Sequence, residues 1–474
     1  MDTILRKYRP IMPSITQHDS VVAGGAVYQE GVLNRSQKTR SMRNRRIGIL
    51  ASLVAVLICQ LGRAEDDSFA IRHVNVVDVI SGTTKPDMAV LIFGNRIVEV
   101  VPDAQFKATG DAKNIDGTGK FLIPGMWDMH VHLGNATEAA LPYLVSLGVT
   151  GVRDMGSPSF ATIHRWSIEA LSGKRIGPRI VAPGPILTMG DPYYWEMVVH
   201  GPADGRAAVD MLAEQGVDFI KITQTLDRDT YFAIADESRK LNITLAGHLP
   251  VNDNGMGYKV SGIEASNAGQ KCFEHTQGIP LPFETQDPAL IPTLLKNGTW
   301  IDPTLTTYYA RAHVHELADR QDDPRLKHLA PGFRQFWNGQ INDFPKTSKI
   351  PEQVFEWRSQ EVLALYKAGV PLLAGTDMGF PYVFPGDVTR EMELFVEAGL
   401  PPLEALRTAT INPARYLNWD KVMGSVDEGK IADLVILDGD PLQDIRNTRK
   451  VRSVVLNGRF LDRQALDSIV PNFQ

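Results

Sequence analysis

The sequence predicts an α/β fold, a (β/α)8 TIM barrel with a small β-sandwich formed by the N- and C-terminal segments. Short apolar segments alternate with helical stretches such as GRAAVDMLAEQG, and both ends of the chain carry β-rich runs. The eight apolar segments are residues 121–133, 148–155, 179–187, 218–222, 243–249, 271–276, 299–305 and 370–378. A doubly wound open sheet is the alternative, but no glycine-rich phosphate loop follows the first segment.

The N-terminal part of the 474-residue chain carries an export signal that begins at Met42. Three arginines precede the apolar run of residues 47–61, and Gly62-Arg63-Ala64 forms a small-x-small cleavage site, in the order of a secretory signal. A single membrane anchor is the alternative, but the run is shorter than the roughly 20 residues that a spanning helix needs. We therefore expect a periplasmic or secreted protein without stable membrane association after cleavage.

The predicted domain organisation follows from these segments. We assign residues 1–41 to an atypical N-terminal extension, 42–64 to the signal peptide, 65–120 and 419–474 to the two parts of the β-sandwich, and 121–418 to the barrel. Removal of residues 1–64 would leave a strongly acidic chain, which disfavours nucleic acid as a partner. It would also leave a single cysteine, Cys272, and hence no internal disulfide. A homo-oligomer is compatible with the sequence.

Ligand-type side chains follow or end five of the predicted strands. In GMWDMHVHL, His130 and His132 stand at positions i and i+2, which leave the same face of a strand and can converge on one metal ion. Lys221, His248, His275 and Asp377 lie at or near the ends of the fourth, fifth, sixth and eighth segments. Since the C-terminal ends of barrel strands form the active-site rim, these residues together predict a metal centre.

Lys221 is the unusual member of this set. An ammonium group has three donors and no lone pair for a metal. If the amine loses its proton and takes up carbon dioxide, the resulting carbamate has two oxygens that can bridge two metals. The alternative is an ion pair with Asp218 or another carboxylate.

The motifs PGMWDMHVHL, DFIKI, AGHLP, FEHTQG and AGTDMG together resemble the amidohydrolase superfamily, in particular its imidazolonepropionase-like and Xaa-Pro dipeptidase-like (prolidase-like) branch. The resemblance implies two divalent metal ions, with Zn²⁺ as the expected metal. It implies that His130, His132 and Asp377 hold one ion, that His248 and His275 hold the other, and that carbamylated Lys221 bridges them.

The expected function is that of a metal-dependent amidohydrolase acting on an amide or peptide bond of a small dipeptide-like or N-acyl substrate. A metal-activated bridging hydroxide would attack the carbonyl, and Asp377 would pass the proton to the leaving nitrogen. Lactone, carbamate or phosphotriester hydrolysis uses the same centre, and a non-catalytic ligand-binding barrel is the other alternative. A deaminase is disfavoured because His248 is followed three residues later by Val251 instead of glutamate.

Two further residues are candidates for substrate contact. Arg153 ends the second segment and could clamp a substrate carboxylate, or it could form an internal ion pair with Asp154. Tyr231 follows the fourth segment and could donate a hydrogen bond to substrate, or it could pack against the barrel.

Overall fold

A computed structural model gives the structure of the chain. It describes residues 68–107, 112–157, 159–192, 196–252, 257–280, 282–314, 316, 322–343 and 350–473. The predicted extension and signal peptide, residues 1–64, lie outside the described residues. No helix within the described part of the chain has both the length and the apolar character needed to span a bilayer.

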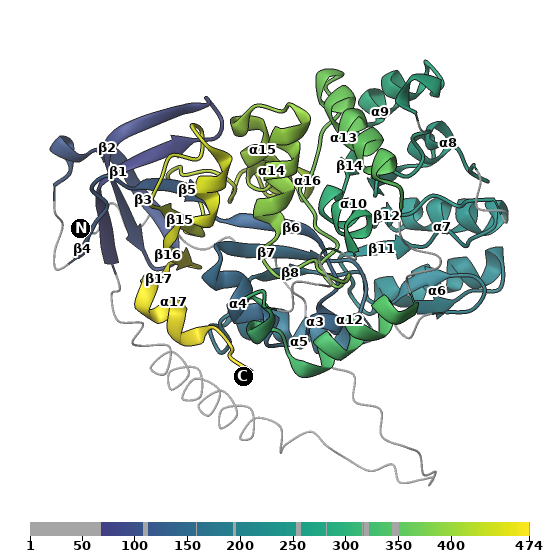
Figure 1. Cartoon of the computed structure of the whole chain (residues 1–474), viewed down its shortest axis with the longest axis horizontal. Coiled ribbons are helices and arrows are strands. Elements are labelled where there is room, and N and C mark those ends of the chain that lie inside the picture. The colour runs from purple at the N-terminus through teal and green to yellow at the C-terminus, as the bar shows by residue number, and fades with distance from the viewer. Residues whose placement is uncertain are drawn as a thin grey trace, which may run out of the picture. The chain divides into compact units, whose positions relative to one another are not determined.

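The two β-rich ends of the chain form one sheet (Figure 1). Its strand order is β17 (Arg459–Leu461), β16 (Val451–Leu456), β15 (Leu434–Leu437), β5 (Phe121–Pro124), β1 (Ser68–Asp78), β2 (Thr83–Phe93) and β3 (Arg96–Pro102). An additional strand outside this order, β4 (Lys113–Asp116), pairs with β1. The ends therefore do pair, as the sequence predicts. The predicted sandwich is not confirmed, because hydrogen bonds join all these strands into a single sheet. The predicted first barrel segment also divides, since β5 belongs to this sheet.

Side chains on the two faces of this sheet pack into two different hydrophobic cores. In β15, Leu434 and Ile436 lie in a small hydrophobic core that also contains Ile71 of β1. Val435 and Leu437 point to the other face of the sheet, into the main core of the molecule. This alternation is the period of two that a strand with two apolar faces requires. The sheet is thus attached to the rest of the molecule through one continuous apolar face.

The parallel strands form two further sheets. One has the order β6 (Met126–Val131), β7 (Val149–Asp154), β8 (Arg179–Val181), and the other has the order β10 (Glu196–Val198), β9 (Ile186–Thr188), β11 (Phe219–Ile222), β12 (Thr244–Gly247), β13 (Gln270–Glu274), β14 (Trp300–Asp302). Single parallel bridges connect Leu372 to Ile301 of β14 and Met378 to Val131 of β6. Residues 370–378 thus link the two sheets as the eighth segment.

Hydrogen bonding around the predicted barrel is interrupted within its third segment, residues 179–187, whose first part, β8, pairs with β7 and whose second part, β9, pairs with β11. Between these two parts the chain runs Pro183-Gly184-Pro185, and proline has no backbone N–H to donate to a neighbouring strand. The contact across this break comes from Asp218, whose backbone N–H donates to the Ala182 carbonyl at 2.9 Å while its carboxylate accepts the Ala182 N–H at 2.8 Å. The strands follow the order of a barrel with one interruption.

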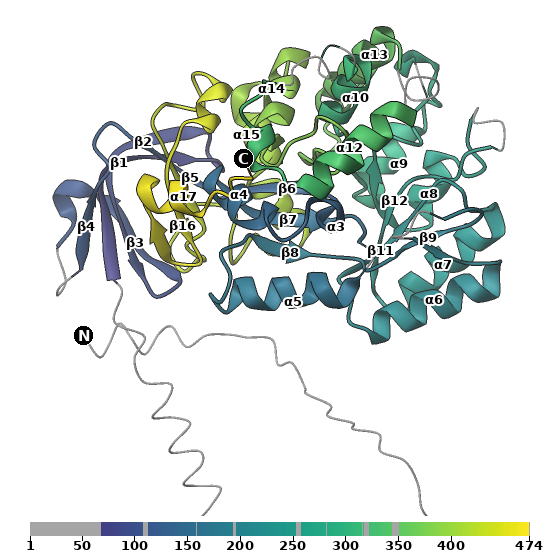
Figure 2. The same ribbon diagram turned by 60° about the horizontal axis from the view of Figure 1, so that its bottom comes forward.

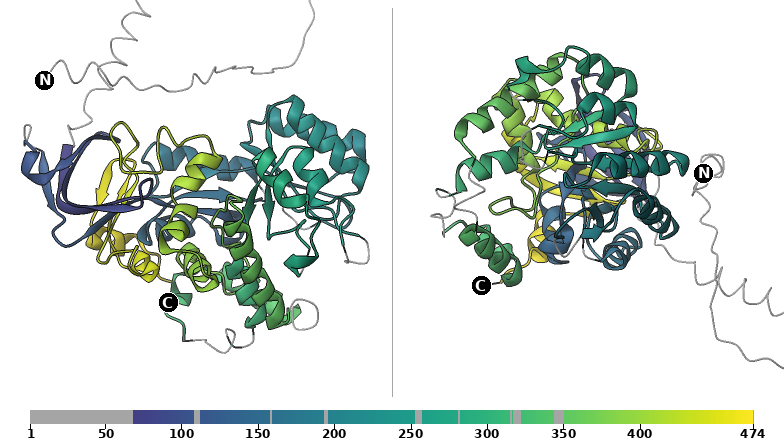
Figure 3. Two further views of the ribbon diagram at one scale, coloured as in Figure 1. Left: turned by 90° about the horizontal axis from the view of Figure 1, so that it is seen from above. Right: turned by 90° about the vertical axis from the view of Figure 1, so that its right-hand side faces the viewer.

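Helices cover the outer side of the parallel strands (Figures 2 and 3). Their bounds are α3 (Leu133–Ala136), α4 (Ala140–Ser146), α5 (Phe160–Leu171), α6 (Pro202–Glu214), α7 (Arg228–Lys240), α8 (Gly262–Asn267), α9 (Leu290–Asn297), α10 (Leu305–Ala312), α12 (Pro331–Asp343), α13 (Glu352–Lys367), α14 (Val388–Ala398), α15 (Pro402–Thr408) and α16 (Ile411–Tyr416). The last helix, α17 (Arg463–Ile469), lies instead against α4, β16 and β17. Local side chains define where some of them begin. The Asp227 carboxylate accepts the Thr230 N–H at the start of α7, and Ser261 and Glu264 form a capping box on α8.

Candidate metal centre

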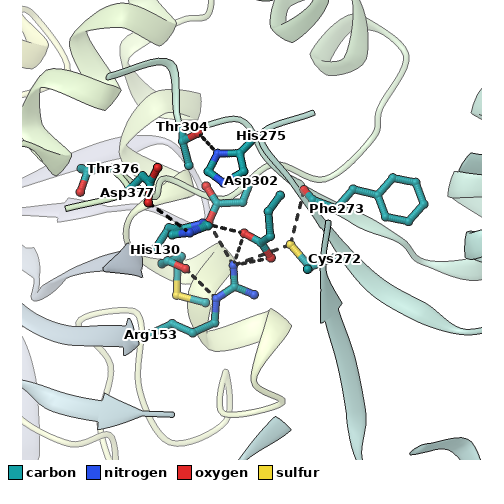
Figure 4. Close-up of polar contacts among 12 residues, drawn as sticks. His130, Arg153, Cys272, Phe273, His275, Asp302, Thr304, Thr376 and Asp377 are labelled. Atoms are coloured by element: carbon teal, nitrogen blue, oxygen red, sulfur yellow. Dashed lines mark hydrogen bonds and ion pairs between the residues drawn. The ribbon is translucent and has the colours of Figure 1, made fainter. Parts of the chain in front are cut away.

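His130 and His132 converge on one carboxylate, as their spacing predicts. His130 lies near the end of β6, and His132 directly follows that strand. The Nε2 atoms of His130 and His132 lie 3.5 and 3.3 Å from Oδ1 of Asp377. Figure 4 shows His130 and Asp377 facing each other beside His275. These side chains therefore point into one site even though Asp377 comes from the last segment of the barrel.

The other predicted histidines continue this group of rings. His248 follows β12 and His275 follows β13. The ring centroid of His275 lies 4.7 Å from that of His130 and 4.9 Å from that of His248. His130, His275 and Asp377 each offer a ligand atom, and these atoms all lie within 4.8 Å of one another. The spacing is that of ligands around a metal ion.

Each of the four imidazoles has its Nδ1 atom occupied by a neighbour. The contacts are His130 with Oε2 of Glu274 at 3.0 Å, His132 with the Gly156 carbonyl at 3.1 Å, His275 with Oγ1 of Thr304 at 2.6 Å, and His248 with Oε1 of Gln224. Contacts of this kind orient metal-ligating histidines; where the partner is a carboxylate, carbonyl or amide oxygen, it also accepts the Nδ1 proton and leaves the Nε2 lone pair for the metal, whereas the Thr304 hydroxyl can donate or accept.

Lys221 belongs to the same centre. It lies in β11 with only 1% of its surface exposed, and its Nζ atom has no hydrogen-bond partner among the described residues. Burial lowers its pKa to about 8. Burial, followed by the nearby Lys221 charge, lowers the pKa of both His130 and His248 well below the ordinary value. The site therefore holds neutral His130 and His248 side chains beside an amine whose pKa is lowered. Against the effect of burial, the pKa of His132 is raised by its hydrogen bond and charge interaction with Asp377.

The Asp377 carboxylate is the anionic member of the centre. Burial acts to raise its pKa, but the hydrogen bond with His132 and the charge interactions with the neighbouring histidines and Lys221 outweigh burial and lower the pKa. The Nε2 atom of His130, like Nζ of Lys221, is buried without a hydrogen-bond partner in the described part of the chain. Buried polar atoms without partners are costly; a metal ion here would satisfy Nε2 of His130 directly, and Nζ of Lys221 only once its amine has become a carbamate. The residues present thus fit a divalent metal centre.

The backbone at the strand ends is strained where the ligands lie. His275, Thr304 and Asp377 have φ angles of 57°, 52° and 61°, in the left-handed region that side chains other than glycine rarely adopt. Such conformations persist where surrounding contacts hold them, and they concentrate at functional sites. Here they turn the side chains of His275, directly after β13, and Asp377, in the eighth segment, into the centre.

Asp128, which precedes His130 on β6, connects this strand to the eighth segment. Its carboxylate accepts the backbone N–H groups of His130 at 3.2 Å and Thr376 at 3.0 Å, and the Thr376 hydroxyl at 2.7 Å. Burial raises the pKa of Asp128 to about 7. Asp128 thus holds the backbone beside His130 and Asp377.

The positions of Arg153 and Tyr231 do not support the predicted substrate contacts. Both side chains are fully buried. Arg153 pairs with Glu274 at 2.9 Å and Asp302 at 3.1 Å instead of Asp154, and the Tyr231 hydroxyl donates to Oε1 of Gln270 at 2.9 Å. Since their polar groups are engaged inside the protein, both residues act within the interior.

Sequence reasoning missed Glu274 and the other Nδ1 partners. Glu274 stands between the apolar strand KCF and the predicted ligand His275. A charged residue at the end of a buried strand requires a buried partner. The position of Glu274 in the sequence therefore could have indicated a buried polar contact next to the site. Gln224 and Thr304 carry no comparable signal, because polar residues are common in the loops that follow strands.

Comparisons with known proteins agree with this geometry. A family model described as Amidohydrolase family matches residues 121–461. An adenine deaminase from Rubrobacter xylanophilus is 22% identical over 400 residues, which cover 80% of this chain and 55% of the relative, so the chain spans about half of that relative's length. A crystal structure of a proposed prolidase from Bifidobacterium longum has a TM-score of 0.69 at 24% identity, with 85% of this chain and 98% of that chain covered.

A second solved structure is a Xaa-Pro dipeptidase with methionine bound in its active site. It has a TM-score of 0.65 at 22% identity, and the match covers 84% of this chain and all of that chain. Together the family match and these structures identify the parallel-strand region as a TIM-barrel-type α/β domain, although its sheets are not closed.

Proposed function

This chain belongs to the amidohydrolase family, and from that premise we propose that it hydrolyses an amide or peptide bond with two zinc ions. Family membership places it among the hydrolases that act on carbon–nitrogen bonds. The observation that carries the proposal is the set of four imidazoles whose Nδ1 atoms are all occupied, arranged with Asp377 and Lys221.

The ligands divide into two groups. We assign His130, His132 and Asp377 to one ion and His248 and His275 to the other. This division follows the resemblance of the motifs. The ring centroid of His275 lies 4.7 Å from that of His130 and 4.9 Å from that of His248, so the two groups of ligands adjoin each other. Divalent ions at this position would polarise the scissile carbonyl and lower the pKa of the attacking water.

Carbamylated Lys221 is the proposed bridge between the two groups. Its neutral amine would attack carbon dioxide, forming an N–C bond and releasing one proton to solvent, so that the neutral amine becomes an anion with two oxygen atoms. Burial of the side chain and the pKa of about 8 support this step, because they raise the fraction of neutral amine above that of an ordinary lysine. The Nζ atom also lacks any hydrogen-bond partner in the described structure that would hold it as an ammonium.

Asp377 is the proposed proton carrier. Its lowered pKa keeps the carboxylate ionised, so it can accept the proton of the attacking water. Its Oδ2 atom lies 3.4 Å from the hydroxyl of Thr307, which donates at 2.9 Å to the Thr376 carbonyl. Asp377 would then deliver the proton to the leaving nitrogen, which an amide needs because an amide anion is a poor leaving group.

We propose a small dipeptide-like or N-acyl substrate. The likeness to a proposed prolidase and to a Xaa-Pro dipeptidase supports this class. Lactone, carbamate and phosphotriester substrates remain alternatives for the same centre. Deamination, the activity named for the adenine deaminase relative, is disfavoured because Val251 stands where the resemblance would require glutamate.

The proposal is tested by metal analysis together with a substrate screen. We expect two divalent ions per chain, and hydrolysis of members of a library of dipeptides, N-acyl amino acids and lactones by the zinc-loaded protein. Lys221→Ala should lose most of the bound metal and regain part of it with a short carboxylic acid, which can occupy the space left by the side chain. One ion in the wild type, or full occupancy in Lys221→Ala, would contradict the bridged pair.

A further inference from the structure

We infer that Glu274 is a positioning residue for the metal centre and that Arg153 holds it in place. In this arrangement Glu274 fixes the tautomer and the direction of His130, so one of the two metal ions depends on a buried ionic contact that the other lacks. This inference rests on the proposed binuclear function and assigns a role to two residues outside the ligand set.

The contact between Glu274 and His130 is fully enclosed. Both residues have no exposed surface, and Oε2 of Glu274 lies 3.0 Å from Nδ1 of His130. A carboxylate is acceptor-only when ionised, so it holds the proton on Nδ1 and leaves Nε2 with its lone pair. That Nε2 atom faces Asp377 at 3.5 Å. A carboxylate acceptor also increases the basicity of a metal-ligating imidazole.

Arg153 holds this carboxylate from the opposite side. Its Nη2 atom donates to both oxygens of Glu274, at 3.0 and 2.9 Å, and to Oδ2 of Asp302 at 3.1 Å. Its Nε atom donates to the Met129 carbonyl at 2.6 Å, in the residue directly before His130. Figure 4 shows Arg153 extending between His130, Asp302 and Cys272. One guanidinium thus fixes both the backbone next to His130 and the acceptor of its side chain.

Close packing of the eighth segment restricts movement of this group. A Cβ atom at Gly375 would lie 2.4 Å from the Asp302 carboxylate and 2.6 Å from Cβ of His130. Only glycine lets the backbone approach so closely. The His130 ring and the carboxylates around Arg153 therefore have little freedom to reorient.

The other histidines have neutral Nδ1 partners, which makes the contact of His130 distinctive. Thr304 occupies Nδ1 of His275 through a hydroxyl at 2.6 Å, and Gln224 occupies Nδ1 of His248 through its amide. Hydrogen bonds with an ionised partner are roughly twice as strong as neutral ones. Loss of Glu274 should therefore weaken the His130 ion selectively.

The test is metal affinity of Glu274→Gln, measured by chelator competition with zinc and by the absorption spectrum of the cobalt-substituted protein. Gln has the same shape, but its amide can also donate, so it no longer enforces one tautomer of His130. Loss of an orienting partner typically costs 10- to 100-fold in metal affinity. We expect about this loss for one of the two ions, with the second ion retained and the cobalt spectrum altered.

Two matched variants accompany this measurement. Tyr416→Phe removes the hydrogen bond that Nη1 of Arg153 makes at 3.0 Å and leaves Glu274 untouched, so both ions should bind as in the wild type. Thr304→Val removes the neutral partner of His275, so the other ion should weaken. If Glu274→Gln does not fold, Arg153→Lys replaces it, because lysine keeps the charge but cannot hold both carboxylates and the Met129 carbonyl.

The outcomes separate the two claims. A wild-type protein that binds no divalent metal contradicts the proposed function. A wild-type protein with two ions, together with a folded Glu274→Gln or Arg153→Lys variant whose two affinities are unchanged, overturns the positioning role alone. Equal weakening of both ions in the folded variant also overturns it, because the ionic contact would then not be specific to the His130 ion.

Discussion

Replacement of Lys221 by methionine should stabilise the metal-free protein while it removes the proposed bridge. Burial lowers the pKa of Lys221 from its ordinary value of 10.5 to about 8. The unfolded chain therefore binds a proton more tightly at this position than the folded protein does. The resulting penalty is fully present below pH 8 and disappears as the pH rises past 10.5.

The size of this effect follows from the pKa difference. At 1.36 kcal/mol for each pKa unit, the free energy of unfolding of the metal-free protein should rise by about 3 kcal/mol in Lys221→Met at pH 7. By pH 10 the same calculation leaves less than about 1 kcal/mol. Methionine has a similar length, so the substitution should leave no large cavity.

The assay is urea denaturation of the metal-free protein at pH 7 and pH 10, with a chelator and with buffers depleted of carbon dioxide. Lys296→Met is the matched control, because Lys296 is exposed in the last turn of α9 and its removal should change stability by at most about 0.5 kcal/mol. Lys221→Met should also bind less metal than the wild type. Equal stability of Lys221→Met and wild type at pH 7, or a difference that does not shrink by pH 10, would refute the reasoning.

Three further predictions concern the proton carrier, a corrected residue and export. Asp377→Asn keeps the size of the side chain and one ligand oxygen, so it should retain metal while kcat falls by about 10² to 10⁴; retention of both metal and more than about a tenth of kcat would exclude the proton role. Tyr231→Phe should lower the free energy of unfolding by about 1 kcal/mol through loss of its bond to Gln270. Its kcat and KM should stay within about twofold of wild type, and a larger change would restore a substrate role. Expression from Met42 in a bacterium should yield an exported protein whose N-terminal sequencing begins at Glu65, not at an uncleaved end.

Local sequence was sufficient for the features that depend on short-range geometry. The i and i+2 spacing of His130 and His132 places two rings near one point wherever a strand ends there, and both do meet Asp377. The resemblance to the amidohydrolase superfamily with prolidase-like members is confirmed for the same reason, since its motifs are short and contiguous. The β-rich runs at both ends of the chain likewise predicted that these ends pair.

Tertiary structure decided the features that depend on distant partners. Arg153 meets Glu274 and Asp302 across 121 and 149 residues, so its neighbour Asp154 suggested the wrong ion pair. The Nδ1 partner of His130 lies 144 residues away, and no local pattern specifies such a contact. The order of the eight apolar segments could be read along the chain, whereas only the tertiary structure showed that the third segment divides into β8, which pairs with β7, and β9, which pairs with β11. Burial of a charged group is a property of the packed interior, and only that interior determines which partner satisfies it.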